Sequence, residues 1–140
     1  MVRFMSVMGL MACSSTALAQ TCPVNMTLVT AQISRLETSY GDTLSDISCD
    51  APTIPAQRIL CGEVGGNDDQ LWTMSRLDDL AFAYAYENAT KTEFDPDNTP
   101  RDAAFIARRD ACKDQTCLCE ALIAHSNASL GGLSPYTHRQ

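Results

Sequence analysis

Apolar residues recur at steps of three and four along most of the chain, which is the spacing of one face of an α-helix. From Met26 to Tyr40 they form one such stripe, which Gly41 ends, although the threonines of this stretch also permit an extended conformation. The strongest pattern follows Asn67 or Asp68, either of which is a suitable N-cap. Apolar residues lie on more than one face of this long helix, so we expect it to be sandwiched between other elements.

Two further helices are predicted in the last third of the chain. Thr99 as N-cap and Pro100 at the first helical position predict a helix that runs to about Cys112. After a charged turn, a last helix is expected from about Thr116 to Leu130, where two glycines stop it. Because the connections are short, we expect consecutive helices to lie antiparallel.

The remaining stretches show little periodicity. Residues 42–66 contain two prolines, which we expect to break any helix, and two cysteines, which we expect to pin an irregular segment. Residues 132–140 are expected to form a disordered tail. The pattern as a whole predicts an all-α fold, a small antiparallel helical hairpin or bundle of three to four helices, preceded by a partly helical segment over residues 20–48.

The N-terminus has the layout of a secretory signal peptide. Arg3 precedes a short apolar run, and Ala17-Leu18-Ala19 forms a small-x-small cleavage site, so we expect residues 1–19 to be removed. An alternative makes Leu10 to Cys13 a lipoprotein box, with Cys13 lipidated and the protein held at a membrane. In both cases we expect a bacterial protein that is periplasmic or secreted, without a segment that spans a bilayer.

Charge narrows the range of partners. The chain carries a formal net charge of −7. Nucleic acids and anionic membrane surfaces are bound by clustered Lys and Arg, so both are disfavoured as partners. A basic partner is permitted, and attraction would speed its association, while solubility alone is the plainer explanation of the charge.

Loss of the signal peptide leaves six cysteines, an even number that predicts three disulfides in a small exported chain, with fifteen possible connectivities. They are Cys22, Cys49, Cys61, Cys112, Cys117 and Cys119. The turn between the last two helices brings Cys112 and Cys117 within plausible disulfide range. The order of the helices gathers the cysteines at one pole of the molecule.

Zinc binding and redox catalysis are the competing interpretations of the cysteine cluster. Cys112, Cys117, Cys119 and His125 could be pictured as zinc ligands, but their spacing is not that of a CxxC pair, and export argues against free thiolates. A redox site would favour CxxC at the start of a helix in a βαβ unit, whereas this chain has Cys-Leu-Cys. We therefore expect neither a metal nor a cofactor.

The chain offers little material for catalysis. Asp78 and Asp79 are adjacent, so on a helix they point about 100° apart, which is poor geometry for an acid–base pair. Arg109 shares a helix face with Phe105, and an arginine that faces a core needs a carboxylate. We expect Asp78 or Asp79 to supply it in a structural ion pair, with surface exposure of Arg109 as the alternative. We expect no catalytic residue and no enzymatic activity.

Several of these features together resemble a known family. Cys49 and Cys61 precede a long helix that contains Leu77-Asp78, and the later run "FIARRDAC" is followed by a short turn and Cys117-Leu118. This arrangement resembles the lysozyme inhibitor LprI N-terminal family, a group of exported bacterial domains, over residues 49–131. The chain departs from the family at Phe105 and Leu122, which stand for the usual Trp and Tyr. It also departs in the spacing of the helix tyrosine, whether Tyr84 or Tyr86 is taken.

The resemblance implies a disulfide scheme. The family pattern leaves Cys22 and Cys119 outside, which implies that they form an extra bridge. The pairs expected first are Cys112–Cys117, Cys49–Cys61 and Cys22–Cys119. The alternative pairs are Cys61–Cys112 and Cys49–Cys117.

The resemblance also implies a function. It indicates an exported, non-enzymatic binding protein that inhibits lysozyme, with a basic lysozyme or related muramidase as its partner. It carries over no inhibitory residue, because the Ser-Gly-x-x-Tyr loop of other bacterial inhibitors is absent. The alternative is a structural or envelope-stress protein of the cell envelope without an enzyme target, and a hydrolase with an unrecognised site is a third hypothesis.

The loop "EFDPDN" is the expected contact with a basic partner. It carries Glu93, Asp95 and Asp97 around Phe94. The charges would steer the encounter while Phe94 fills an apolar pocket of the partner. The alternative is an ordinary solvated turn with Phe94 folded back, in which case the side of the long helix that bears Phe82 and Tyr86 is the next candidate.

Overall fold

The helix α3 (Asp68–Thr90) runs through the centre of the structure and positions the other elements around it. The computed structural model describes residues 22–62 and 68–137, which fold without any strand. Over those residues the other helices are α1 (Met26–Tyr40), α2 (Pro55–Leu60), α4 (Ala103–Asp110) and α5 (Gln115–Leu130), with short 3-10 turns η1 (Pro96–Asn98) and η2 (Gly131–Leu133). The predicted all-α class is confirmed. The predicted signal peptide and Cys13 lie outside the described residues.

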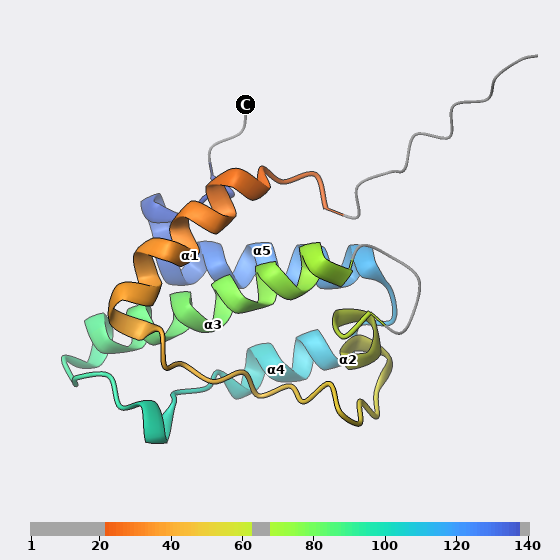
Figure 1. Cartoon of the computed structure of the whole chain (residues 1–140), viewed down its shortest axis with the longest axis horizontal. Helices are drawn as coiled ribbons and strands as arrows, with labels where there is room; N and C mark the ends of the chain where they lie inside the picture. Colours follow the sequence, from red (N-terminus) through yellow and green to blue (C-terminus); the bar gives the residue numbers. More distant parts are fainter. Residues whose placement is uncertain (1–21, 63–67, 138–140) are drawn as a thin grey trace, which may run out of the picture.

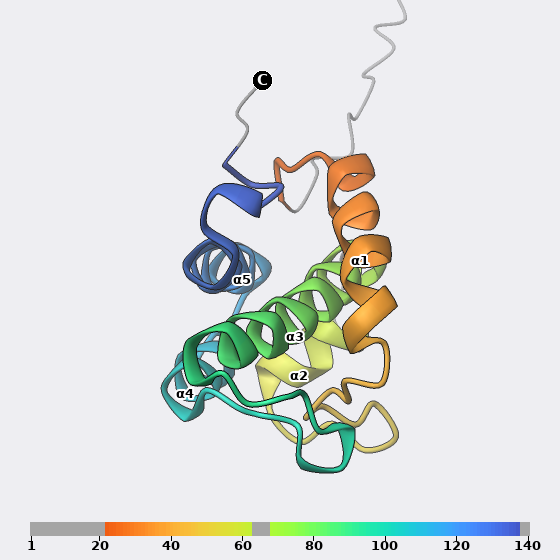
Figure 2. The same cartoon turned by 90° about the vertical axis from the view of Figure 1, so that its left-hand side faces the viewer.

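The helix α3 packs between α1 and α5 and also contacts α2 (Figure 1, Figure 2). Leu71, Met74, Leu77 and Leu80 are fully buried along its length. The expectation of a helix sandwiched between other elements is therefore confirmed. The predicted antiparallel order holds for the chain after α3, since α4 runs opposite to both α3 and α5 in Figure 1. As a consequence, α3 and α5 run in the same direction. No helix among the described residues combines the length and the apolar character that crossing a membrane requires.

Side-chain carboxylates and amides fix where the helices begin. Asn25 accepts hydrogen bonds from the first N–H groups of α1, and Asp114 accepts one from Cys117 in α5. The prediction for α4 was wrong, because its N-cap is Asp102 and not Thr99. Thr99 is held extended ahead of Pro100, as residues before proline usually are. Asp102 instead accepts two N–H groups at the start of α4, which an aspartate does well.

The prediction that residues 42–66 contain no helix was also wrong, because α2 begins at Pro55. Proline is well tolerated at the first helical position, where its missing N–H would have no partner in any case. Ala56, Ile59 and Leu60 are buried against the core, so this short helix is stabilised by packing. Residues 42–54 form no regular element, as expected.

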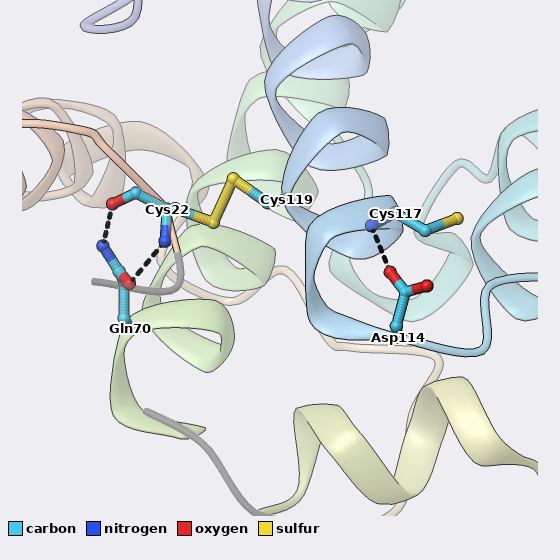
Figure 3. Close-up of a disulfide and its surroundings, with 5 residues drawn as sticks. All are labelled: Cys22, Gln70, Asp114, Cys117 and Cys119. Atoms are coloured by element: carbon cyan, nitrogen blue, oxygen red, sulfur yellow. Dashed lines mark hydrogen bonds between the residues drawn. A yellow bond between two sulfur atoms is a disulfide. The ribbon is translucent and has the colours of Figure 1, made fainter. Parts of the chain in front are cut away.

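The three expected disulfides are confirmed. Cys22–Cys119, Cys49–Cys61 and Cys112–Cys117 join Cα atoms that lie 5.7, 5.5 and 5.5 Å apart. They lie at the end of the molecule where α3 and α5 begin (Figure 1). Figure 3 shows how Cys22 is attached to this end, since the buried Gln70 side chain accepts from the Cys22 N–H at 3.1 Å and donates to its carbonyl at 2.8 Å.

The C-terminal segment is ordered to Thr137, contrary to the predicted disordered tail. Gly131 ends α5 with a positive φ of 54°, a backbone conformation that favours glycine. Beyond it the fully buried Ser134 donates its hydroxyl proton to Asn127 at 2.6 Å. Tyr136 packs against both core clusters and anchors the segment over the helices. Residues 138–140 of the predicted tail lie outside the described residues.

The disulfides should contribute unequally to stability. Cys22 and Cys119 are 97 residues apart in sequence, whereas Cys112 and Cys117 are only five apart. Loop-closure entropy predicts a loss of about 4.7 kcal/mol in the free energy of unfolding for Cys22→Ser/Cys119→Ser, and of about 2 kcal/mol for Cys112→Ser/Cys117→Ser. Urea denaturation of the two double variants measures the difference. Equal losses would contradict the entropic explanation.

Candidate functional site

The imidazole ring of His125 lies at the centre of a buried group of charges between α3, α4 and α5. The side chain is only 6% exposed. It stacks on Phe105 of α4, with ring centroids 3.8 Å apart and planes within 2° of parallel, and on Phe82 of α3 at 5.5 Å. These aromatic contacts fix the plane of the ring, and with it the directions in which its two nitrogens point.

Both ring nitrogens of His125 face carboxylates. Nδ1 lies 2.8 Å from Asp78 of α3, and Nε2 lies 3.2 Å from Asp102 at the start of α4. Burial alone would lower the pKa of His125, but the hydrogen bonds and charges of Asp78 and Asp102 outweigh it and raise the pKa. The Phe105 N–H bond and the imidazole in turn lower the pKa of Asp102. Both ring nitrogens thus face a carboxylate, and this geometry together with the raised pKa favours the imidazolium form, although burial also raises the pKa of Asp78.

This arrangement cannot act as a nucleophile and base pair. The hydroxyl of Ser126, which also bonds in this group, donates to Asp78 at 2.9 Å. An imidazolium that donates from both nitrogens has no lone pair to accept a proton or to bind a metal. The group holds three helices together, and sequence reasoning missed it because only the fold brings Asp78, Asp102 and His125 together.

Arg109 is buried and paired, as one of the two sequence hypotheses has it, but the predicted partner was wrong. Its guanidinium donates to both carboxylate oxygens of Asp46, at 2.8 and 2.7 Å, and its Nε donates to Asp110 at 2.9 Å. The bond from Arg109 lowers the pKa of Asp46 despite partial burial. Asp78 is not available to Arg109, because it is bonded to His125. Asp46 lies in the irregular segment, where no periodicity could have pointed to it.

Asp79 is the least satisfied carboxylate of the group. Its side chain is 12% exposed, and its nearest cation is Arg101, 3.8 Å away, too far for a hydrogen bond. Burial and then the charge of Asp78 raise the pKa of Asp79 to about 7. A cavity of about 20 Å³ beside it is lined by the same charged groups and has room for about one water molecule.

The group as a whole has a surplus of negative charge. Its ion pairs involve five carboxylates but only three cations, His125 included. The carboxylates are Asp46, Asp78, Asp79, Asp102 and Asp110. Asp46, Asp102 and Asp110 are partly exposed to water, so the cost of unpaired charge falls on the buried Asp78 and Asp79, whose pKa values burial raises.

The loop proposed as the partner contact is held against the end of α3. Glu93, Asp95 and Asp97 are exposed, as a partner site requires. Phe94 does not serve as a free anchor, because its ring packs edge-on against Tyr40 of α1 at 5.5 Å and it is half-buried. The folded-back alternative is the one observed for this ring. Its cause is Glu87, which accepts the Phe94 N–H at 2.7 Å and the Tyr40 hydroxyl at 3.0 Å.

The remaining candidates from the sequence are placed as follows. Phe82 belongs to the His125 stack, whereas Tyr86 is 43% exposed on the next turn of α3, with the two ring centroids 6.4 Å apart. The six cysteines of the described chain are bound in disulfides, which leaves no thiolate among them for zinc.

Comparison with protein-family models, curated proteins and solved structures found no match to the chain. The likeness to the LprI family thus stays a prediction.

The charge of His125 should be visible in solution. Because the pKa of the ring is raised on folding, the stabilisation is complete below the unfolded value of about 6.5 and is lost as pH rises through the folded value. We expect NMR titration to give a pKa for His125 above 6.5. His125→Gln should lower the free energy of unfolding by about 3 kcal/mol at acidic pH, and by less in alkali. A titration midpoint below 6 would show that the buried ring is neutral.

The ionised carboxylate of Asp79 should lower the free energy of unfolding above about pH 7. A carboxylate whose pKa is raised from 3.8 to about 7 favours the folded state when protonated, and this contribution is lost as pH rises from about 4 to about 7. We therefore expect Asp79→Asn to raise the free energy of unfolding by about 2 kcal/mol at pH 8 and to change it little at pH 4. Chemical denaturation at the two pH values measures this. Asp97→Asn, at an exposed site, is the matched control, and a loss of stability in Asp79→Asn at pH 8 would contradict the argument.

Proposed function

We propose that the protein is an exported, non-enzymatic binding protein of the bacterial cell envelope that inhibits a basic lysozyme or a related muramidase. We name lysozymes and related muramidases as the target because residues 49–131 resemble the LprI family. The disulfides of the described chain fit an oxidising compartment, which supports export to the periplasm or the medium. The observation that carries the proposal is the acidic loop, defined as residues 93–98.

The acidic loop is presented in a fixed shape. Glu87 bonds both to the backbone of the loop and to Tyr40 of α1, and burial with this bond raises the pKa of Tyr40 to about 12, so the phenol remains a donor. Asp95 accepts the N–H of Asp97 within the η1 turn. A loop that is already ordered loses less conformational entropy when a partner binds, which favours affinity.

The surroundings of the acidic loop hold charges of both signs, including the exposed Lys91 two residues before the loop, so the negative charge of this face comes mainly from the loop itself. The contact between Tyr40 and Phe94 places the end of α1 beside the loop, and the exposed Asp42 follows that end directly. Arg76 bonds to Glu37 and to the carbonyls of Gly41 and Thr43 at the end of α1. Its positive charge is therefore balanced and does not offset the charge of the acidic loop. This face therefore suits a partner with a positive surface, which it would attract over a distance of about a Debye length.

A non-enzymatic function is supported by the state of the charged group around His125. The ring donates from both nitrogens to carboxylates, and the hydroxyl of Ser126 is directed to Asp78, so no activated nucleophile arises from these residues. The alternative function is a structural or envelope-stress protein without an enzyme target, for which the acidic surface would serve solubility alone.

A lysozyme turbidity assay separates these two functions. We expect the purified protein to slow the clearing of a cell-wall suspension by at least one of the chicken-, goose- and invertebrate-type lysozymes, in proportion to its concentration. A reduced and alkylated sample serves as the control, because it should lose the fold that presents the acidic loop. Unchanged lysis by all three enzymes in large molar excess would exclude inhibition and favour the structural alternative.

Neutralising the acidic loop should slow association. We expect Glu93→Gln/Asp95→Asn/Asp97→Asn to lower the association rate with the inhibited lysozyme about tenfold at low salt and to flatten its salt dependence. Thermal stability should change little, since all three side chains are exposed and asparagine retains the capping oxygen of Asp95. Surface plasmon resonance at several salt concentrations measures both effects.

The matched control is Asp50→Asn/Glu120→Gln, which removes two exposed charges away from the acidic loop. It should leave the association rate within about twofold. Equal slowing by both variants would mean that net charge alone attracts the partner. Unchanged association in the loop variant would place the contact elsewhere, with the exposed Tyr86 as the next candidate.

A further inference from the structure

A second cavity lies on the α1 side of Asp79. It has a volume of about 190 Å³ and opens between α1, α3 and the irregular segment. Ile33 of α1, Ser45 of the irregular segment, and Trp72, Arg76 and Asp79 of α3 are among its lining residues. Trp72 is 38% exposed, unusually open for so large an aromatic side chain. The cavity is smaller than the roughly 300 Å³ of a typical drug-sized site, so it suits a single side chain.

Of the two charged residues that line this cavity, Arg76 is already neutralised. Its guanidinium bonds to Thr43 and Gly41 carbonyls at 2.6 and 2.8 Å and to the carboxylate of Glu37 at 3.4 Å. Its donors are thus directed at the end of α1 and its charge is balanced. Asp79, in contrast, has no ion pair closer than 3.8 Å, the distance to Arg101, and Arg109 acts on it only from further away.

Asp79 lines both this cavity and the charged cavity around His125. It therefore connects open space to a buried group that has five carboxylates and three cations. A cation that entered from the Trp72 side would reduce the negative surplus without disturbing any ion pair that the group already has.

We propose that the cavity between Trp72 and Asp79 binds an organic cation, namely the side chain of an arginine or a lysine that a basic partner inserts. This inference rests on the proposed function, because it names the group of the partner that the molecule receives. The carboxylate of Asp79 would accept charge-assisted hydrogen bonds from the cation in a largely desolvated place. The ring of Trp72 would stabilise it through a cation–π contact, and Ile33 would pack against the aliphatic stem.

The protonation of Asp79 gives the site a pH dependence. With a pKa of about 7, Asp79 carries a proton in weak acid, and an incoming cation must displace it. The charged groups that act on Asp79 are Asp78 and Asp46, which raise its pKa, and Arg101 and Arg109, which lower it. Binding of a cation should therefore strengthen as pH rises from about 5.5 to about 8.5.

The experiment uses the single tryptophan of the chain as its probe, since Trp72 lines the cavity. The protein is titrated at pH 8 with Nα-acetyl-arginine amide, with Nα-acetyl-lysine amide, and with the neutral isostere Nα-acetyl-citrulline amide. Sodium chloride of equal ionic strength is the blank. We expect a saturable change in Trp72 fluorescence for the two cations, with a dissociation constant on the order of 1 mM, and at least tenfold weaker binding of citrulline.

Asp79→Asn is the decisive variant. We expect it to weaken binding of the arginine amide about tenfold and to abolish the pH dependence. Glu120→Gln, at an exposed position of α5 outside the cavity and the acidic loop, should bind as the unmodified protein does. Because Asp79→Asn is expected to stabilise the fold at pH 8, lost binding cannot be attributed to unfolding, and a denaturation curve of the same sample verifies this.

Three outcomes would overturn the proposal. Equal binding of arginine and citrulline amides would show an apolar cavity without a role for charge. Unchanged binding in Asp79→Asn would remove the carboxylate from the site. No saturable fluorescence change up to the solubility limit of either cation would mean that the cavity holds only water.

Failure of the cavity and failure of the proposed function give different results. If the arginine amide binds through Asp79 but no lysozyme is inhibited, the cation site stands and the inhibitory function is dropped. If a lysozyme is inhibited equally by the unmodified protein and by Asp79→Asn, and neither cation binds, the function stands and the cavity is not the place where the partner docks.

Discussion

The imidazolium of His125 is the contact that α3, α4 and α5 share, and the internal arrangement of the protein depends on its charge. A neutral imidazole has only one N–H group, so it could donate a hydrogen bond to Asp78 or to Asp102 but not to both, and no positive charge would lie between the two carboxylates. With it, the start of α4 is attached to the middle of α3 and the middle of α5. The pair Arg109 and Asp46 extends the same principle outward and attaches the irregular segment to α4.

The regular parts of the fold follow from local rules. Apolar periodicity and the glycines that follow located α1 and α5 within a residue or two, whereas their N-caps, Asn25 and Asp114, were not predicted. Local rules failed where tertiary contacts decide the outcome. Pro55 was interpreted as a helix breaker, although packing of the residues after it stabilises a helix that it begins. Tyr136 orders a polar tail that by composition alone resembles a disordered one.

The candidate site was harder to predict than the fold. The spacing of Arg109 from Phe105 indicated a buried arginine, but its partner Asp46 lies 63 residues away in a segment without periodicity. His125 was considered only as a possible zinc ligand, because its real partners are distant in sequence. They come from α3 and α4, which meet α5 only in the folded chain. Of the disulfides, the helical hairpin indicated only that Cys112 and Cys117 lie close together, and the full scheme came from the family resemblance.

The uneven placement of the cross-links has a consequence for internal motion. The three disulfides and the Gln70 clamp lie where α3 begins, whereas the opposite end of the same helix is held by hydrogen bonds of Glu87 and by aromatic packing alone. Native-state opening should therefore be graded along α3, with amide hydrogens near Glu87 exchanging through local fluctuations and those near Met74 only through global unfolding. The end that carries the acidic loop thus keeps its shape through non-covalent contacts, whereas the opposite end is also held by covalent cross-links.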